Sequence, residues 1–206
     1  GKLREAVAAV EKAVALDPDL PEPHGNLGLM LWTAGEKARA EAALREAIRI
    51  QPEYADAHNN LANLLAGNGD FEQARGHFET ALRLRPKDAR TRYNYAMALG
   101  RARLYDDAQR QLEASLKDDP RLVDAHLLLA DLLLARDEGE AALPHYREAV
   151  RLEPASGRAL LGLGSALAMT GDVAGAIPYL KKAAGGGDPA ARDDANQLLK
   201  QLGVNP

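Results

Sequence analysis

The stretch PEYADAHNNLANLLAGNGDFEQARGHFETALRLRP, residues 52–86, decides the fold because it begins and ends on a proline that recurs along the chain. Neighbouring members of this proline series are each separated by 34 residues. The series consists of Pro18, Pro52, Pro86, Pro120 and Pro154. A strict period of this length is typical of stacked helical hairpins, in which each repeat buries its apolar face against the next repeat. The sequence therefore predicts an all-α repeat array.

The recurrent proline also sets the boundaries of the repeats. With this proline at slot 32 of a 34-residue frame, residues 1–20 become the second half of a truncated repeat. We expect five full repeats after it, at 21–54, 55–88, 89–122, 123–156 and 157–190. A C-terminal helix within 188–206, with Asp188 as N-cap and Pro189 at its first position, is predicted to cap the last repeat.

Two apolar patterns within each repeat predict its two helices. In the first helix, slots 4, 7, 8 and 11 follow the 3-1-3 spacing of one helical face, as in His58, Leu61, Ala62 and Leu65. In the second helix, slot 20 is always alanine, and a larger apolar residue follows four positions later. These alanines are Ala6, Ala40, Ala74, Ala108, Ala142 and Ala176.

Glycines punctuate the turn inside the repeats, where a helix end favours a residue that tolerates positive φ. They stand at Gly1, Gly35, Gly69 and Gly171. Arg103 and Asp137 replace this glycine in the other two repeats, although Gly139 lies close to the second of them.

Together these slots resemble the tetratricopeptide repeat (TPR) consensus, from Gly1 to about Ala184. The resemblance implies a right-handed solenoid of antiparallel helix pairs, closed by the capping helix. It also implies a surface that holds another protein or a peptide.

The amino-acid composition argues against several classes of function for this protein. The net charge of −4 argues against a nucleic-acid surface, which needs clustered Lys and Arg. The chain has no cysteine, so disulfides and thiol catalysis are excluded, and the redox compartment stays open. No apolar run approaches the roughly 20 residues of a membrane span. The sequence does not identify the compartment, and a cytoplasmic location is the default expectation.

A second stripe on each first helix, at slots 2, 5, 6 and 9, lines the concave groove in TPR arrays. Asn26, Asn60 and Asn94 occupy slot 6 in three successive repeats, and an amide can pair with both the N–H and the C=O of an extended peptide. These residues resemble the asparagine ladder in the TPR superhelix of O-linked N-acetylglucosamine transferase. The ladder stops at Leu128 and Gly162, and a merely solvated asparagine face stays open as the alternative.

The predicted peptide-binding set comprises Asn26, Asn60, Asn63, Arg90, Tyr93, Asn94, Met97, Asp124 and Arg158. A clamp for acidic C-terminal peptides is not expected, because Asn59, Asp124 and Leu128 replace the basic residues that this clamp requires.

The histidines do not suggest a metal site. His24, His58 and His126 fill core slots on successive repeats about 10 Å apart, whereas ligands of one zinc ion lie roughly 4 Å apart. His77 and His145, at slot 23, are predicted to lie on the outer face of the second helices. We expect no metal and no cofactor.

The sequence thus predicts a non-enzymatic scaffold whose partner is an extended peptide or a helix of another protein. Two alternatives remain: a substrate-recruiting arm of a larger enzyme such as a glycosyltransferase, or a self-assembling structural subunit. Homo-oligomers would then form through the open N-terminal repeat end, where Val7, Val10 and Val14 are apolar.

Overall fold

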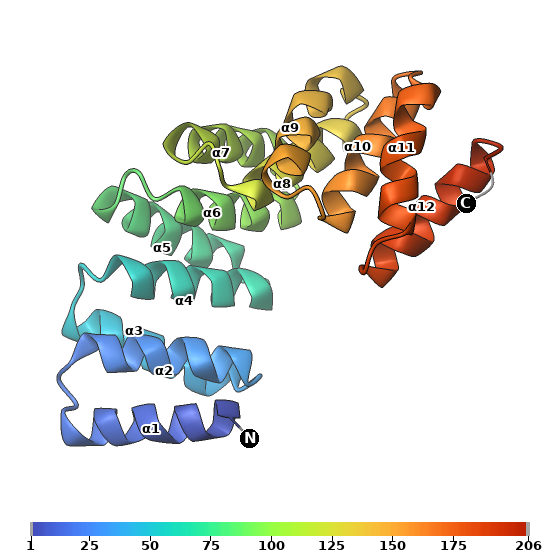
Figure 1. Ribbon diagram of the computed structural model, residues 1–206. Coiled ribbons are helices and arrows are strands. Elements are labelled where there is room, and N and C mark those ends of the chain that lie inside the picture. The colour runs from blue at the N-terminus through green and yellow to red at the C-terminus, as the bar shows by residue number, and fades with distance from the viewer. Residues whose placement is uncertain (1, 205–206) are drawn as a thin grey trace. The chain divides into compact units, whose positions relative to one another are not determined.

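The computed structural model describes residues 2–204, which form helices joined by short turns (Figure 1). The first six helices are α1 (Lys2–Leu16), α2 (Pro21–Thr33), α3 (Lys37–Ile50), α4 (Ala55–Asn68), α5 (Phe71–Leu84) and α6 (Ala89–Arg101). The others are α7 (Tyr105–Asp118), α8 (Val123–Ala135), α9 (Gly139–Leu152), α10 (Gly157–Met169), α11 (Val173–Ala184) and α12 (Pro189–Gln201). Among these described residues there is no strand, so the predicted all-α class is confirmed.

The chain divides into two compact units, with the boundary between Gln111 and Leu112 inside α7. In the first unit, α2 packs on α3 and α4 packs on α5, and each hairpin contacts the next one through α3 with α4 and α5 with α6. The first helices α2, α4 and α6 also contact one another in succession, and they form one layer of the unit (Figure 1). A side chain at the same slot of each first helix therefore belongs to one continuous face.

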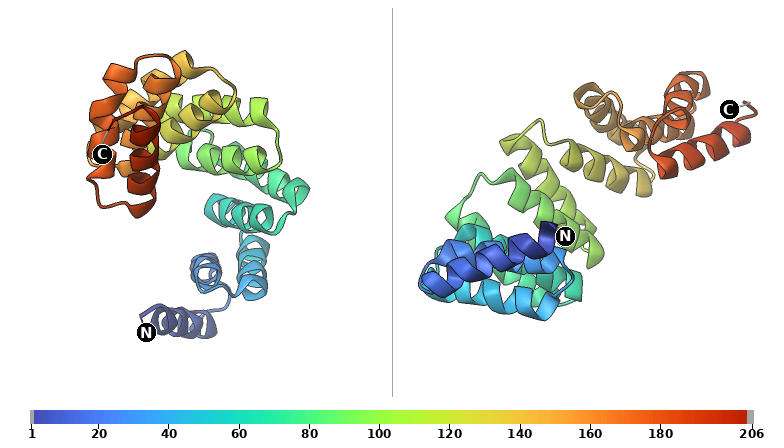
Figure 2. Two further views of the ribbon diagram at one scale, coloured as in Figure 1. Left: turned by 90° about the vertical axis from the view of Figure 1, so that its right-hand side faces the viewer. Right: turned by 60° about the horizontal axis from the view of Figure 1, so that its bottom comes forward.

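The second unit repeats the same packing with α8 on α9 and α10 on α11, and α10 contacts both α8 and α9. Helix α12 lies against α10 and α11, in red in both views of Figure 2. Ala191, Ala195 and Leu199 of α12 are buried in this contact. The capping helix thus shields the apolar face of the last hairpin.

The core consists of the periodic slots that the sequence marks. The slot-20 alanines from Ala40 to Ala176 are at most 3 % exposed, and the larger residue four positions later is equally buried. A Cβ on Gly28 would lie 2.5 Å from the Leu44 side chain, and one on Gly164 would lie 2.6 Å from that of Leu180. The small residue at slot 8 therefore makes room for a leucine side chain of the paired helix.

The turn inside each repeat uses the left-handed backbone region. Gly35, Gly69 and Gly171 have φ values of 82°, 95° and 91°. Arg103 and Asp137 adopt the same conformation, with φ of 62° and 64°, although both carry a Cβ. The turn geometry is therefore imposed by the packing of the two helices, and these two side chains accept the strain. The expected turn glycine Gly1 lies outside the described residues.

Short polar side chains cap the starts of α6, α10, α11 and α12. Asp188 accepts hydrogen bonds from the backbone N–H groups of Ala190 and Ala191, at 3.1 and 3.3 Å, which confirms it as the N-cap of α12. Asp88, Ser156 and Asp172 cap α6, α10 and α11 in the same way. Within residues 2–204, no helix is both long enough and apolar enough to cross a membrane.

Candidate peptide-binding surface

The first unit carries a cluster of side-chain amides on α4 and α6, which we call the asparagine cluster: Asn59, Asn60, Asn63 and Asn94. Asn94 Nδ2 donates a hydrogen bond to Asn59 Oδ1 at 3.1 Å, and this bond joins α6 to α4. Asn63 Nδ2 lies 3.5 Å from the same oxygen, and Asn59 Nδ2 lies 3.5 Å from Asn60 Oδ1. All four side chains are half-buried, so each amide is oriented and still reaches solvent.

Asn59 is the centre of this cluster, and the predicted set of peptide-binding residues omitted it. It occupies slot 5, whereas Asn94 occupies slot 6 of the next repeat. A signal was present in the sequence, because the two residues lie 35 positions apart, one more than the repeat length. This offset places them opposite each other on neighbouring first helices.

The other predicted residues of the first unit surround the cluster. Asn26 is exposed on α2, and Leu29, one turn further along the same helix, is 43 % exposed. Tyr93 and Met97 are half-buried on α6, and Arg90 is exposed at the start of that helix. The face therefore combines oriented amides with apolar and cationic groups.

An ion pair and a tyrosine lie at one edge of this face. Arg85 donates two hydrogen bonds to Asp56, Nη1 to Oδ1 at 2.6 Å and Nη2 to Oδ2 at 2.9 Å. The ring of Tyr54 lies over Gly25, where a Cβ would come within 2.9 Å of it. Burial raises the pKa of Tyr54, and the carboxylates of Asp56 and Glu22 raise it further. Tyr54 is thus a neutral phenol beside the carboxylates of Asp56 and Glu22.

The corresponding face of the second unit is built differently. A Cβ on Gly162 would lie 2.3 Å from the Tyr146 ring, so the ladder slot is closed by an aromatic side chain. Tyr146 donates its hydroxyl hydrogen to Asp131 Oδ1 at 2.6 Å, and Arg158 Nη2 donates to Asp131 Oδ2 at 2.6 Å. Burial raises the pKa of Tyr146 far above its usual range, and the bond to Asp131 adds to the shift. Arg158 is therefore held by Asp131, whereas the predicted residue Asp124 is exposed on α8.

Histidines at slot 4 tie three of the first helices, α2, α4 and α8, to the turn before them. Nε2 of His24, His58 and His126 lies 2.9–3.0 Å from the carbonyl oxygen of Pro18, Pro52 and Pro120 respectively. In the third repeat Arg92 donates to Pro86 O at 2.7 Å, and in the fifth repeat slot 4 is Leu160, which has no hydrogen-bonding side-chain group. A carbonyl only accepts, so Nε2 of each histidine carries the proton and Nδ1 is the acceptor in the neutral ring.

Two of these histidines pair with the slot-23 histidine of the second helix. The Nδ1 atoms of His58 and His77 are 2.9 Å apart, and those of His126 and His145 are 3.1 Å apart. Burial lowers the pKa of His77 to about 4, helped by His58 and Arg45. Burial likewise lowers the pKa of His145, although Glu113 opposes this shift. His77 and His145, which the sequence predicts on the outer face of the second helices, are half-buried, and each ring contacts the slot-4 histidine of its own repeat.

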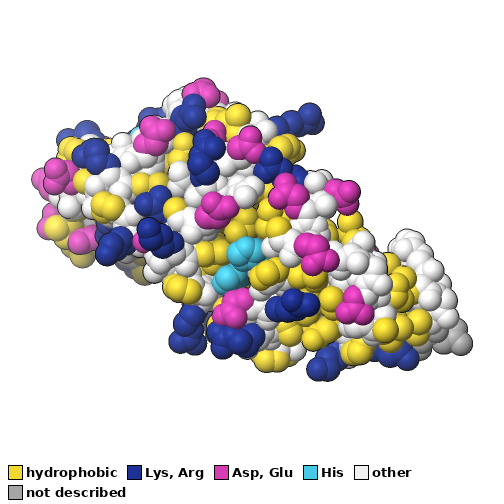
Figure 3. Space-filling model, turned by 90° about the horizontal axis from the view of Figure 1, so that it is seen from above, with side chains coloured by type: hydrophobic (Ala, Val, Ile, Leu, Met, Phe, Trp, Pro, Cys, Tyr) yellow, Lys and Arg dark blue, Asp and Glu magenta, His cyan; other side chains and the backbone are white. Residues whose placement is uncertain are grey.

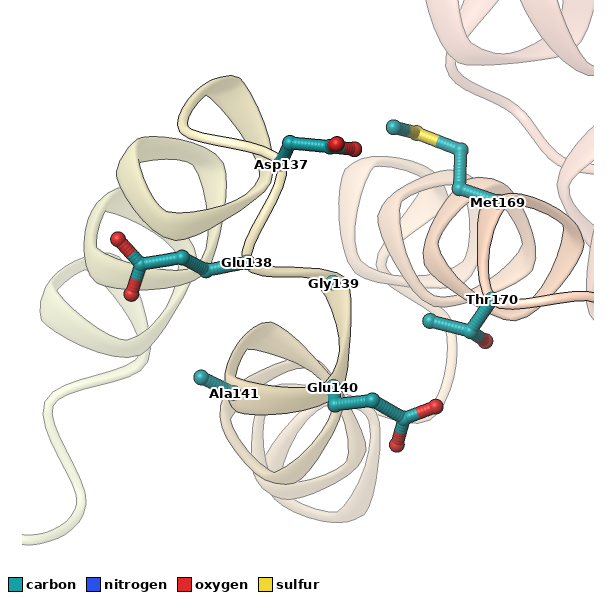
Figure 4. A pocket seen from close by; sticks show the side chains of 7 residues that line it. All are labelled: Asp137, Glu138, Gly139, Glu140, Ala141, Met169 and Thr170. Carbon is teal, nitrogen blue, oxygen red and sulfur yellow. The ribbon is translucent and has the colours of Figure 1, made fainter.

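A pocket of 380 Å³ in the second unit has an acidic lining formed by the turn before α9 and the end of α10 (Figure 4). The carboxylates of Glu138 and Glu140 point in opposite directions, and that of Asp137 points toward Met169 (Figure 4). These groups do not converge on a single point. Across residues 2–204, no cluster of three or more His, Asp or Glu side chains is suited to hold a metal ion.

The surface seen from above has interspersed acidic and basic side chains, with histidine rings reaching the surface between them (Figure 3). Many of the charges are paired along single helices, as in Arg45 with Glu41 and Arg151 with Glu148. Such exposed pairs keep the surface hydrated and contribute little to stability.

The chain is built of helical hairpins repeated every 34 residues, and its first helices share a polar face. These features place it in the class of helical-repeat scaffold proteins. Two family models described as tetratricopeptide repeat match the chain, one at residues 1–55 and 127–196, the other at 31–98 and 65–132. The chain belongs to the tetratricopeptide repeat family. No curated protein matches it in sequence.

Several solved structures share the fold. PilF of Pseudomonas aeruginosa is 22% identical, with a TM-score of 0.76 over 88% of this chain and 91% of its own. PilW, described as a widely conserved type IV pilus biogenesis factor, is 18% identical, with a TM-score of 0.82 over 96% of this chain and 90% of its own. YrrB, described as a TPR protein with an unusual peptide-binding site, is 20% identical, with a TM-score of 0.68 over 92% of this chain and 98% of its own. At these identities the likeness establishes the fold, and TPR folds serve as protein–protein interaction scaffolds.

Proposed function

We propose that the face formed by α2, α4 and α6 binds an extended segment of a partner protein, with the slot-6 asparagines pairing with its backbone. The observation that carries this proposal is the Asn94–Asn59 bond of 3.1 Å, which fixes amides from two neighbouring repeats in one half-buried cluster. Amides held in place before binding lose less rotamer freedom when a ligand arrives.

The spacing of the repeats matches an extended chain. Packed helices lie about 8–10 Å apart, and an extended peptide advances about 3.3 Å per residue. One asparagine per repeat would therefore meet about every third residue of a peptide that crosses α2, α4 and α6. A primary amide has two donor hydrogens and two acceptor lone pairs, so Asn94 retains one donor and its acceptor after bonding Asn59.

The residues around the cluster supply side-chain preference. Tyr93, Met97 and Leu29 offer apolar contacts, and Arg90 favours an acidic residue of the partner. For a ligand of the second unit's own first-helix face we assign charge selection to Asp124, and a smaller contribution to Arg158 because Asp131 already holds its guanidinium. The likeness to YrrB, which is described as having a peptide-binding site, supports a peptide as the ligand.

We also propose that the repeat array catalyses no reaction itself. The polar groups of its first-helix face bond one another, and the acidic pocket of the second unit has carboxylates that diverge. Incubating the purified chain with a panel of ester, phosphate and glycoside substrates should give no turnover above the buffer rate. Turnover that copurifies with the chain and disappears on its removal would show the proposal to be wrong.

The test of binding begins with a peptide selected from a random library on the intact chain, followed by calorimetric titration. Asn60→Ala and Asn94→Ala should each weaken binding about fivefold, the equivalent of about 1 kcal/mol per hydrogen bond. The double variant should lose about 10- to 30-fold, and by similar factors for peptides of different sequence, because the backbone is the target.

Asn68→Ala is the matched control, since Asn68 is an exposed asparagine at the end of α4 and away from the cluster. It should bind as the unaltered chain does. If the double variant binds every selected peptide as tightly as Asn68→Ala does, the asparagine face is only solvated and the proposal fails.

A further inference from the structure

The first full repeat contains a cavity where the other repeats contain a side chain. It is wide open to solvent, has a volume of about 310 Å³ and lies among α1, α2 and α3, lined by Val14, His24, Leu27, Ala43 and others. This volume is at the lower end of the range for small-ligand sites. The cavity belongs entirely to the first unit and is separate from the asparagine cluster.

The cause of the cavity is a single small residue at slot 23. Ala43 occupies this slot in the first full repeat, whereas every later repeat has a planar side chain there. Those side chains are His77, Gln111, His145 and Tyr179. In the second and fourth repeats the slot-23 ring bonds the slot-4 histidine, and in the third repeat Arg92 Nη1 donates to Gln111 at 3.2 Å.

His24 is therefore a histidine without its usual partner. Its Nε2 lies 2.9 Å from Pro18 O, as in the other slot-4 histidines, and the residue is only 8 % exposed. Among residues 2–204, no side chain hydrogen-bonds Nδ1 of His24, the atom that meets the slot-23 ring in the other histidine repeats. His24 lines the cavity, and by analogy with the other histidine repeats its Nδ1 is the atom that a slot-23 ring would meet.

The rest of the lining suits a small aromatic ring with an N–H donor. Val14, Leu27 and Leu31 supply apolar walls for the ring faces. Glu46 lies near His24, and Arg49 holds its carboxylate. At the rim, Arg39 is paired with both Glu11 and Glu36, so it bridges α1 and α3. An acceptor nitrogen and a carboxylate beside apolar walls favour a donor over a second acceptor.

We propose that this cavity is a binding socket for an imidazole ring presented by a histidine of a partner polypeptide. The chain itself identifies the ring: in both repeats where slot 4 is histidine and slot 23 is filled, the filling side chain is histidine. The partner's ring donates an N–H hydrogen to Nδ1 of His24 and reproduces the His58–His77 pair between two chains. This proposal does not depend on peptide binding by the asparagine cluster.

Free imidazole is the probe for the first experiment, followed through the ring nitrogens of the histidines by ¹⁵N NMR at pH 9. This pH is well above the ordinary imidazole pKa of about 6.5, so the rings are neutral. Imidazole should move the Nδ1 signal of His24 with saturation in the millimolar range, as its few heavy atoms allow. The signals of His58 and His126 should stay in place, because their Nδ1 atoms already have partners.

A second probe isolates the hydrogen bond. Neutral 1-methylimidazole has the same ring but no N–H donor, and we expect it to bind at least fivefold more weakly, the value of one net hydrogen bond. Equal binding of the two probes, or equal shifts at all the slot-4 histidines, would overturn the proposal.

The variant that tests the socket is Ala43→His. Its new ring should fill the cavity and pair with His24, which would give a third histidine pair. We expect it to abolish the imidazole-induced shift and to raise the Tm by about 2–4 °C, as one net hydrogen bond does in a chain of this length. Ala38→His adds the same side chain at an exposed position of α3 and should change neither. Imidazole binding that persists in Ala43→His would place the site elsewhere and refute the socket.

A pair of peptides, with and without histidine, tests whether the socket accepts a histidine of a polypeptide. A short peptide with a central histidine should shift His24 Nδ1 at lower concentration than imidazole, and its alanine counterpart should not shift it. If free imidazole binds but neither peptide does, the cavity takes only free imidazole-type molecules and the partner-histidine proposal is wrong.

Discussion

The first-helix faces of the two units use polar side chains in opposite ways. In the first unit, four half-buried amides are linked by hydrogen bonds of 3.1–3.5 Å, and each still has groups to offer a ligand. In the second unit, Tyr146, Asp131 and Arg158 satisfy one another, and the aromatic ring covers Gly162. One repeat frame therefore produces an open amide face, which we propose binds a ligand, and a face whose polar groups bond one another.

The largest expected change in stability comes from placing an asparagine of the first unit's kind on the first-helix face of the second unit. Gly162→Asn restores the ladder residue, but its Cβ would fall 2.3 Å from the buried ring of Tyr146. We expect a loss of about 3 kcal/mol in the free energy of unfolding, at the upper end for overpacking. Urea denaturation followed by circular dichroism measures it.

Gly25→Asn is the matched substitution in the first unit. Its Cβ meets the half-exposed Tyr54 ring at 2.9 Å, and that ring has solvent to move into. We expect a loss of less than about 1 kcal/mol, smaller than the typical cost of overpacking a closed core. Equal losses in the two variants would contradict the distinction between a closed and an open face.

Removing one acidic residue from each unit gives the next largest difference. Asp131→Ala deprives the buried Tyr146 hydroxyl of its acceptor, which should cost about 1–2 kcal/mol. Asp56→Ala breaks only an ion pair whose two side chains are about half exposed, so we expect less than about 1 kcal/mol. Differential scanning calorimetry would show a larger fall in Tm for Asp131→Ala, and the reverse order would refute the stabilising role of the second face.

Each unit also contains one strained turn residue, and replacing it should stabilise the protein. Arg103→Gly relieves a positive φ of 62° on a residue with a long side chain and should add about 0.5–1 kcal/mol. Asp137→Gly should add less, because aspartate tolerates the left-handed region better than arginine does. Urea midpoints of the two variants test the order, and a stability loss in both would show that the turns are not strained.

The histidine pairs predict an acid sensitivity that is greater in the first unit. The folded-state pKa of His77 is lowered to about 4, so between the ordinary histidine value of about 6.5 and pH 4 the unfolded chain binds more protons. Stability should therefore fall as the pH falls through this window. His77→Gln should flatten this fall more than His145→Gln, because Glu113 opposes the shift at His145.

Glutamine is the suitable replacement because Gln111 already occupies this slot in the third repeat. Thermal melts at several pH values between 7 and about 4 measure the slopes. Identical slopes for the unaltered chain and the His77→Gln variant would mean that the pair does not control the acid response.

The sequence was sufficient for the hairpins and their core because the period repeats each signal several times. The slot-20 alanines, the capping role of Asp188 and the left-handed glycines all follow from the identity of single residues. The contacts between repeats were harder to foresee, since they depend on offsets of one or two slots. The Asn59–Asn94 bond spans such an offset. Within a single repeat, the pairing of His77 with His58 depends on how α5 rotates against α4, which the periodic pattern does not specify.

The side-chain bonds to the recurrent prolines have a consequence for local motion. His24, His58, Arg92 and His126 each anchor the carbonyl of the turn that precedes their helix, but the fifth repeat has Leu160 at this slot, and leucine has no hydrogen-bonding group. Besides the backbone bond from Ser156 N to Glu153 O at 3.1 Å, the turn around Pro154 has the Ser156 cap, whose bond to Ala159 N is a long 3.4 Å. Local opening follows the number of such restraints, so amide hydrogens at 153–157 should exchange fastest of the five proline turns, and a protease should cut there first.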